Sequence, residues 1–459
     1  MSGLTGIIMP KLCFAGFDVK LFNTILLGLC FMVLFSAELA TLNMQKTIIS
    51  SIHDENPNFN MEGYFLHGVT YTMYATSLWL APSVVCLTGA RLGMILAGAG
   101  HTYYLLAFST EKEWAIYLGS VIMGLSAAVL WTAENKYLLS NSTPQTRSRN
   151  ISIFWFFYSS SEFYGNLILY FQLEGKKFMD AGTRHLLIFA MGGLSCVALV
   201  MFLFLQPGDR ESKPEKKQNS CETTVNAFKK TWSIFTSREM QILSIAFFYV
   251  GLSQAFTFGV YSPSVGFTLQ FGNNAKQLVA FSGICLGTGE MICGGLQVML
   301  SNSIQKHRYG RFCLMSVGFL LHLVTYVCIY LNLPNNAVFG NTYDTGYIES
   351  SVPLAMVCSL MLGLADCCLN TQVYSLLAAM HPDSGAQTCA LYKFTKAVVK
   401  ATSYYSSNHL GLHTHLHILV PSSVAGVIAY YVIDRKVANR HVTDSELQEL
   451  NKCNTDTGS

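Results

Sequence analysis

The stretch MLGLADCCLNTQVYSLL, residues 361–377, places Asp366, Asn370 and Gln372 within a run of otherwise apolar residues. Together with its apolar neighbours the run is long enough to cross a bilayer as a helix. A charged side chain near the centre of such a helix costs about 2.5–3.5 kcal/mol on insertion scales, so it usually faces a cavity or a partner rather than lipid. The stretch therefore predicts a membrane-spanning helix in which Asp366 faces a cavity and an ammonium group.

The composition of the whole chain agrees with a membrane location. Hydrophobic side chains make up 51% of the 459 residues and charged ones only 12%, which is too apolar for an ordinary soluble domain. The formal net charge is +3, and the positive residues are spread over short segments rather than gathered in one patch. This pattern excludes nucleic acid as an expected partner and makes the lipid bilayer the expected surroundings.

Twelve apolar stretches have the length of membrane spans, roughly 18 residues or more. They fall into two groups of six on either side of a polar break. The first group is 21–42, 64–88, 92–109, 114–139, 151–173 and 185–206; the second is 240–262, 277–299, 312–332, 351–379, 387–409 and 413–433. The pattern predicts an all-α integral membrane protein of twelve transmembrane helices in two six-helix bundles.

The predicted organisation has five parts. An N-terminal segment covers residues 1–20, the first bundle 21–206, a linker 207–239, the second bundle 240–433 and a C-terminal tail 434–459. Lysine and arginine are concentrated in loops on one side, nineteen against six on the other, which predicts that both termini are cytoplasmic. The glycosylation sequons at Asn141 and Asn150 then face the cytoplasm and are expected to be unmodified.

The linker contains TVNAFKKTWSIF, residues 224–235, in which apolar side chains recur at helical spacing beside two lysines. The apolar positions are Val225, Phe228, Trp232 and Phe235. This spacing favours a short amphipathic helix on the inner leaflet, and a solvated linker is the alternative.

The loops after the second span of each half contain matching sequences. GARLG (89–93) and HRYGR (307–311) both carry Arg-x-Gly, and they resemble the loop signature of the major facilitator superfamily. The matching residues are Arg91, Gly93, Arg308 and Gly310. The acid that precedes the arginine in that signature is replaced by Ala90 and His307, which puts its usual gating interactions in doubt.

Apart from histidines and charges at the ends of spans, ionisable residues fall only on certain spans. In the facilitator fold, helices 1, 2, 4, 5, 7, 8, 10 and 11 line the central cavity, and every buried charge lies on one of them. These residues are Glu38, Glu134, Glu162, Glu290, Asp366, Lys393, Lys396 and Lys400. Polar residues that are further candidates for lining a solute cavity are Asn43, Asn166, Asn370 and Gln372.

Helical periodicity groups some of these residues. Lys393, Lys396 and Lys400 share one face, and Asp366 shares a face with Asn370 because the two are four residues apart. The expected arrangement places Asp366 and Glu290 opposite the lysines. Two interpretations remain open: a proton-coupling network, or a structural network of ion pairs.

Signatures of catalysis are not found. The sequence contains no phosphate-binding glycine loop, nucleophile elbow or zinc signature, so no enzyme, cofactor or metal site is predicted. His413 and His417 form an i,i+4 pair without an adjacent carboxylate or cysteine, and interfacial anchoring is expected for them. His101 and His322 are expected to make hydrogen bonds between helices.

Several segments together resemble the uncoordinated-ninety-three-like family, a branch of the major facilitator superfamily. They are LWTAENKYL (130–138), RNISIFW (149–155), Gly165-Asn166-Leu167, SGICLGTGE (282–290), LGLADCCLNTQ (362–372) and LYKF (391–394). Residues that agree with the family pattern are Glu290, Asp366, Asn370, Gln372 and Lys393. Residues that depart from it are Glu38, Lys136, Glu162, Lys396 and Lys400.

The resemblance implies a twelve-helix facilitator fold and a multi-pass membrane location, and it supplies no substrate. Members of the family are known as a regulatory subunit of a potassium channel and as a trafficking chaperone of innate immune receptors. Two functions therefore remain open. One is a secondary transporter of a small solute, coupled to protons; the other is a non-transporting regulator or chaperone of a membrane-protein client.

Overall fold

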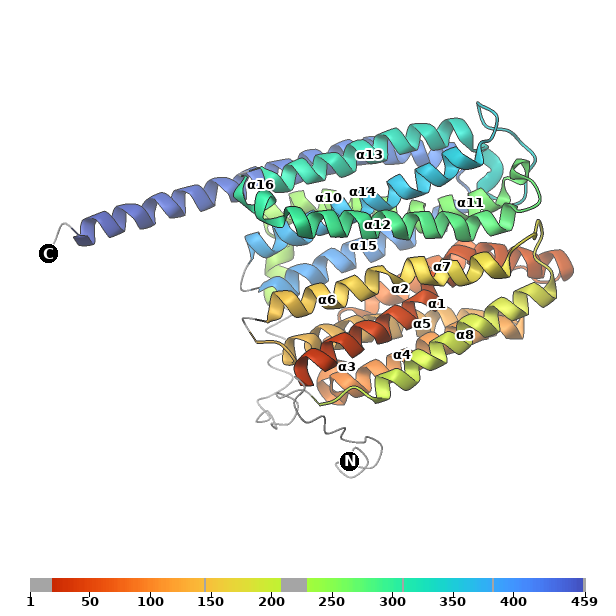
Figure 1. The fold of residues 1–459 in the computed structure, drawn as a ribbon, viewed down its shortest axis with the longest axis horizontal. Helices are drawn as coiled ribbons and strands as arrows, with labels where there is room; N and C mark the ends of the chain where they lie inside the picture. Colours follow the sequence, from red (N-terminus) through yellow and green to blue (C-terminus); the bar gives the residue numbers. More distant parts are fainter. Residues whose placement is uncertain (1–18, 144–145, 208–228, 308, 382–383, 457–459) are drawn as a thin grey trace, which may run out of the picture.

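The computed structural model describes residues 19–143, 146–207, 229–307, 309–381 and 384–456. The chain is almost entirely helical in these ranges, with one isolated backbone bridge between Thr268 and Thr342. Figure 1 shows an elongated bundle in which the helices of the first half lie together on one side and those of the second half on the other. The N-terminal segment up to residue 18 and linker residues 208–228 lie outside the described residues.

The first half contains eight α-helices and one 3-10 turn. They are α1 (Val19–Glu55), α2 (Gly63–Ser77), α3 (Ala81–Thr88), α4 (Ala90–Ala107), η1 (Phe108–Thr110), α5 (Glu113–Ser140), α6 (Arg147–Ser159), α7 (Ser161–Gln172) and α8 (Ala181–Leu203).

Residues 229–235 of the linker are helical and precede the second half. That half comprises α10 (Arg238–Gln254), the π-helix η2 (Ala255–Tyr261), α11 (Ser262–Phe267), η3 (Leu269–Phe271), α12 (Ala275–Lys306), α13 (Gly310–Asn332), η4 (Asn335–Val338), α14 (Val352–Met380), α15 (Gly385–Ser407) and α16 (Leu412–Asp456). The helix α16 continues past the bundle, so the segment predicted as a tail after residue 433 is helical as far as Asp456.

All twelve predicted spans are confirmed as helical, although not every one is a single membrane-length helix. Eight helical segments in the described ranges are by themselves long and apolar enough to cross a membrane, or nine if the bent pair 81–88 and 90–110 counts as one. The remaining spans fall short for physical reasons. The helix α2 has 15 residues, α6 and α7 have 13 and 12, and α15 carries three lysines.

The chain reverses sharply between α3 and α4. The chain bends by 119° between the two helices, at Gly89. The φ of Gly89 is +80°, in the region that glycine adopts without strain. The predicted loop between the second and third spans is therefore a one-residue turn. We call the end of the bundle where α1 begins and α16 leaves the terminal end, and the opposite end the far end (Figure 1).

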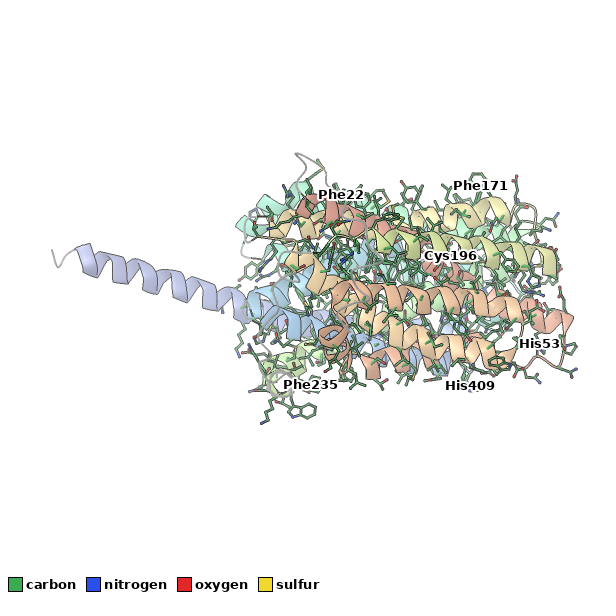
Figure 2. The ribbon with its side chains drawn as sticks, turned by 90° about the horizontal axis from the view of Figure 1, so that it is seen from below. Phe22, His53, Phe171, Cys196, Phe235 and His409 are labelled. Carbon is green, nitrogen blue, oxygen red and sulfur yellow. The ribbon has the colours of Figure 1, made fainter. Side chains whose placement is uncertain are left out.

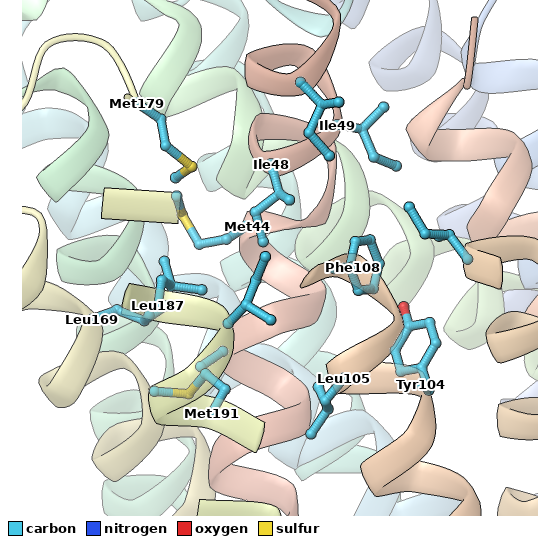
Figure 3. Packing of buried hydrophobic residues seen from close by; sticks show 14 of the residues in the cluster. Met44, Ile48, Ile49, Tyr104, Leu105, Phe108, Leu169, Met179, Leu187 and Met191 are labelled. Carbon is cyan, nitrogen blue, oxygen red and sulfur yellow. The ribbon is translucent and has the colours of Figure 1, made fainter. Parts of the chain in front are cut away.

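Apolar side chains pack between the helices and also cover the outside of the bundle. In the interior of the first half, Met44 and Ile48 of α1 pack with Leu169 of α7 and Met191 of α8 (Figure 3). On the outside, Phe171 projects away from the bundle (Figure 2) and is 67% exposed. Apolar groups on both sides of the helices are what a protein surrounded by lipid requires.

The two halves contact each other at both ends. At the far end, Val279 and Ala280 of α12 belong to the same apolar cluster as Met44 and Ile48 of α1. At the terminal end, the rings of Trp79 and Phe394 meet with centroids 5.3 Å apart. The two halves therefore touch through the α1–α12 cluster and again through the Trp79–Phe394 pair.

Candidate functional site

Four polar side chains form a closed ring inside the second half. Asp366 Oδ2 accepts hydrogen bonds from Gln254 Nε2 at 3.1 Å and from Asn370 Nδ2 at 3.0 Å. Lys396 Nζ donates to Gln254 Oε1 at 3.4 Å and to Asn370 Oδ1 at 3.0 Å. Each amide therefore gives its N–H to the carboxylate and takes an N–H from the ammonium. We call Gln254, Asp366, Asn370 and Lys396 the central ring.

The central ring depends on three helices that approach one another closely. Gln254 is the last residue of α10, directly before the π-helix η2, a distortion often found at functional sites. Asp366 and Asn370 share a face of α14, as predicted from their spacing. Gly251 of α10 lets α15 approach, because a Cβ there would stand 3.1 Å from the Cα of Lys396.

The ammonium of Lys396 is also held by an aromatic residue. Its Nζ lies 4.4 Å from the centroid of the Tyr392 ring, and the Tyr392 hydroxyl donates to Asn370 Oδ1 at 2.7 Å. The partner predicted for Asp366 is therefore present, but the contact runs through two amides. Asp366 is only 7% exposed, so its carboxyl group faces hydrogen-bond donors rather than lipid.

The other two lysines of α15 point toward the first half. Lys393 Nζ lies 4.6 Å from the ring centroid of Trp131 on α5 and interacts electrostatically with Glu134 of the same helix. Lys400 Nζ lies 5.0 Å from the ring centroid of Tyr71 on α2. Lys396 therefore binds within the second half, whereas Lys393 and Lys400 contact residues of the first half.

A second polar group lies in the first half and joins α1 to α7. Glu162 Oε1 accepts hydrogen bonds from Asn43 Nδ2 at 2.6 Å and from Asn166 Nδ2 at 3.0 Å. All three residues are at most 1% exposed. We call Asn43, Glu162 and Asn166 the carboxyl-amide trio. The sequence marked all three as candidates, and the structure brings them together.

Two histidines make the predicted hydrogen bonds between helices. His101 Nδ1 of α4 lies 2.7 Å from Glu38 Oε2 of α1. In the second half, His322 Nδ1 of α13 lies 2.5 Å from the hydroxyl of Tyr249 on α10. Glu38 therefore pairs with a buried histidine of its own half and not with a lysine.

Glu290 is the predicted residue whose surroundings differ most from expectation. It lies on α12 within electrostatic range of Asp366 and Glu162, both acidic, and close to Cys293. In the described part of the chain, no ion pair joins Glu290 to a lysine of α15. The predicted position of Glu290 opposite the lysine face is therefore not accompanied by an ion pair in this conformation.

Gln372 belongs to a separate contact between α12 and α14. Its Nε2 donates to Gln297 Oε1 at 2.9 Å, and Gln297 Nε2 donates to Cys293 Sγ at 3.0 Å. The Sγ atoms of Cys293 and Cys368 lie 3.3 Å apart, and both residues are free thiols.

The loop signatures lie at the terminal end. Arg91 and Gly93 occupy the first turn of α4, and Gly310 is the first residue of α13, whereas Arg308 lies outside the described residues. The neighbouring Arg311 donates from Nε to Asp434 Oδ1 of α16 at 2.8 Å.

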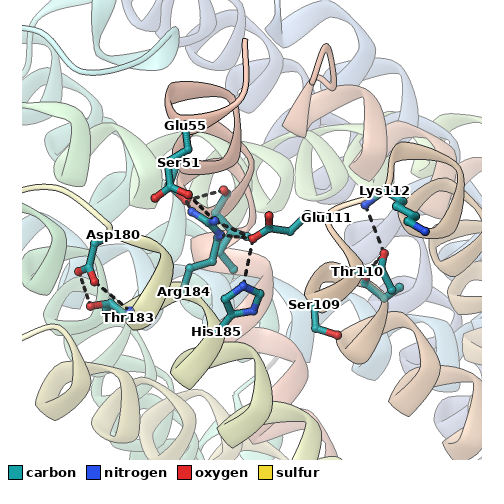
Figure 4. A network of polar contacts seen from close by, with 12 residues as sticks. Ser51, Glu55, Ser109, Thr110, Glu111, Lys112, Asp180, Thr183, Arg184 and His185 are labelled. Atoms are coloured by element: carbon teal, nitrogen blue, oxygen red, sulfur yellow. Dashed lines mark hydrogen bonds and ion pairs between the residues drawn. The ribbon is translucent and has the colours of Figure 1, made fainter. Parts of the chain in front are cut away.

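A polar network at the far end was not predicted. Arg184 of α8, 1% exposed, pairs with Glu55 at 2.9 Å and with Glu111 at 2.6 Å, and its Nη1 donates to Ser51 Oγ at 3.2 Å (Figure 4). The nearby Asp180 caps the start of α8. Its hydrogen bonds from Thr183 and Lys176 hold the Asp180 pKa well below its ordinary value.

An apolar cavity of about 350 Å³ opens near the terminal end between the halves and the linker helix. It is lined by Trp79, Trp232, Phe235, Leu391 and Phe394. Trp232 and Phe235, predicted to share the apolar face of an amphipathic helix, both line this cavity. The remaining predicted members of that face lie outside the described residues.

Comparison with known proteins shows the family to which this chain belongs. The model of the family described as "Ion channel regulatory protein UNC-93" matches residues 58–431. UNC93-like protein MFSD11 of Xenopus laevis is 32% identical over 443 residues, which cover 93% of this chain and 98% of that protein. Protein unc-93 homolog A of Bos taurus is 23% identical, covering 90% and 93%. The chain belongs to the UNC-93 family.

Solved structures with the same fold are transporters of the major facilitator superfamily type. A POT family transporter solved with 5-aminolevulinic acid superposes with a TM-score of 0.65 at 11% identity, covering 94% of this chain and 99% of that one. The nucleoside transporter NupG superposes with a TM-score of 0.61 at 14% identity, covering 91% and 99%. At such identities the likeness shows the fold: a multi-pass, all-helical membrane protein of the facilitator type.

Proposed function

We propose that this protein is a secondary transporter of a small solute, in which the solute binds between the two halves next to the central ring. The central ring is the main observation in support of this proposal. A buried carboxylate and a half-buried ammonium lie inside a membrane bundle, and both are held by amides rather than in direct contact. Ionisable groups are expensive in that position and usually mark a solute or ion pathway.

The amide bridges give the ring a means of responding to a solute. A polar solute that donates to Asp366 or accepts from Lys396 can replace Gln254 or Asn370 without stranding either charge. Gln254 comes from α10, whereas Asn370 comes from α14, so such a replacement changes how two helices are tied together. This is the local event that a rocking motion of one half against the other requires.

The cross-half contacts of α15 support the same mechanism. Lys393 and Lys400 lie over the rings of Trp131 and Tyr71, which belong to the first half. A cation over an aromatic ring is a modest attraction when exposed and a stronger one when shielded from water. These contacts can therefore be broken and remade as the halves separate, while Lys396 stays with its own half.

A regulatory role is the second candidate, and a specific observation favours it. Ala90 occupies the position of the acid in the facilitator loop signature, at the start of α4, so this chain lacks a group usually ascribed to gating. The matched family description also names an ion channel regulator. A regulator would keep the facilitator fold and bind a membrane-protein client through its lipid-facing helices. We further propose that both termini are cytoplasmic, as the lysine and arginine distribution predicts.

Solute-induced stabilisation tests the proposal before the solute is known. Purified protein in lipid nanodiscs is heated in the presence of a panel of metabolites, and unfolding is followed by intrinsic fluorescence. A solute at 100 times its dissociation constant stabilises the folded state by about 2.7 kcal/mol. We expect at least one chemical class to raise the unfolding temperature of the wild type but not of Asp366→Asn. Stabilisation by no metabolite, with a membrane protein co-purifying in fixed ratio, favours the regulator instead.

A further inference from the structure

The carboxyl-amide trio contains two buried oxygen atoms that the described hydrogen bonds leave without a partner. They are Glu162 Oε2 and Asn43 Oδ1. The other atoms of the same two groups are joined, because Asn43 Nδ2 donates to Glu162 Oε1 at 2.6 Å. Buried polar atoms nearly always find a partner, so two neighbouring exceptions require an explanation.

One proton accounts for both atoms. A carboxylic acid and a primary amide form a paired ring of two hydrogen bonds, in which the amide N–H donates to the acid C=O and the acid O–H donates to the amide C=O. The first of these bonds is the one observed. The second bond would run from a protonated Glu162 Oε2 to Asn43 Oδ1, the two oxygens that lack partners.

The surroundings of Glu162 agree with a neutral acid. Among the described residues, no lysine, arginine or histidine forms an ion pair with Glu162. Glu162 is 1% exposed. The titratable groups that face it are Glu290 of α12 and Tyr158 of α6, neither of which supplies positive charge. An uncompensated carboxylate in such a place would be very costly. Asp366, by contrast, has Lys396 beyond its amides.

The trio is sealed by the opposite half of the protein. A Cβ at Gly287 of α12 would stand 2.8 Å from the backbone nitrogen of Phe163 and 3.2 Å from Cβ of Glu162. Gly283, one turn earlier on α12, faces the side-chain amide of Asn166 in the same way. Because these glycines bring α12 against α7 directly over the acid, water reaches Glu162 only when the two halves move apart.

We propose that Glu162, paired with Asn43, is a proton-binding site that takes up and releases its proton when α7 and α12 separate. Release breaks the O–H bond of Oε2, gives the proton to water and leaves a carboxylate held by Asn43 and Asn166. The assignment rests on the proposed transport function, for which it supplies the coupling ion. A sodium ion fits less well, because it needs several oxygen ligands at once and only two oxygens of the trio are unpaired.

Infrared spectroscopy of the protein in lipid tests the assignment without a solute. At neutral pH we expect a carbonyl band of a protonated carboxylic acid that disappears in Glu162→Gln and persists in Glu290→Gln. Glutamine is chosen because its amide can donate to Asn43 Oδ1 as the acid does, so the variant is expected to fold. Identical spectra of the wild type and Glu162→Gln would overturn the proposal. Loss of the wild-type band on adding sodium chloride at constant pH would also overturn it, in favour of a sodium site.

The seal is tested by hydrogen exchange at the same band. Transfer into deuterated water shifts the band slowly in the wild type, and we expect a shift at least tenfold faster in Gly287→Ala, which forces α12 away from α7. An unchanged rate in a folded Gly287→Ala protein would contradict the proposed route of access. Failure to find a transported solute would count against the transport function and not against the infrared results. Solute uptake by a protein that lacks the carboxylic acid band would refute the proton site and not the transport function.

Discussion

The central ring predicts a specific energetic coupling between Asp366 and Lys396. The substitution Lys396→Met keeps most of the side-chain volume and removes the ammonium. The two amides still donate to Asp366, but its buried charge then loses its strongest electrostatic partner and keeps only the interaction with Lys400. Removing one partner of a buried charged network typically costs about 3–5 kcal/mol of unfolding free energy. Asp366→Asn leaves the ammonium unpaired and is expected to cost a similar amount.

The double variant removes both charges and leaves three amides that can hydrogen-bond to one another beside the apolar methionine. We therefore expect it to be more stable than the sum of the single effects predicts, by about 2 kcal/mol, within the range seen for residues that share a network. The unfolding free energies are measured by titrating the protein in mixed micelles with sodium dodecyl sulfate and following helix content. Lys393→Met is the matched control, because Lys393 lies over Trp131 and makes no hydrogen bond to the central ring.

The coupling argument fails if the Asp366 and Lys396 substitutions prove additive. Independent sites add within about 0.5 kcal/mol. Additivity to that precision would mean that the two charges do not sense each other through the amides. An equally large coupling between Asp366 and Lys393 would mean that the ring does not single out Lys396.

Three further predictions concern the packing and topology of the bundle. Arg184→Met is expected to lower the unfolding free energy by about 2–3 kcal/mol, because it removes charged hydrogen bonds whose glutamate partners stay partly solvated; a loss under 1 kcal/mol would contradict this. Gly363→Ala is expected to cost about 1–3 kcal/mol because its Cβ would meet the backbone of α12, whereas Gly193→Ala, where a Cβ has open space, should change stability by less than about 1 kcal/mol in the same titration. Asn141 and Asn150 are 1% and 0% exposed, so enzymatic deglycosylation should leave the electrophoretic mobility of the protein unchanged; a shift abolished by substituting either asparagine would refute their burial.

The sequence predicted the helices better than their partners. Hydrophobic length located all twelve helical stretches, and the spacing of Asp366 and Asn370 correctly placed them on one face of a helix. Periodicity defines a face but does not say which neighbour the face meets. Gln254 was therefore missed as a member of the central ring, since an uncharged amide in an apolar run gives little signal.

Long-range polar contacts were the least predictable feature. Arg184 pairs with Glu55 and Glu111, which are more than seventy residues away along the chain and look like ordinary loop charges. The three lysines of α15 share a helical face in sequence, yet they diverge because their long side chains reach different neighbours. Glu290, expected opposite them together with Asp366, has Asp366 and Glu162 as electrostatic neighbours, and the involvement of Glu162 was not foreseen.

The most direct test of the transport function is solute uptake into proteoliposomes that hold the purified protein. Uptake of a broad metabolite panel is measured with and without an inward proton gradient, for the wild type and for Asp366→Asn at matched protein content. The proposed function predicts gradient-dependent accumulation of at least one solute that is lost in the variant. No accumulation of any solute by folded wild-type protein, or full accumulation by Asp366→Asn, would contradict it.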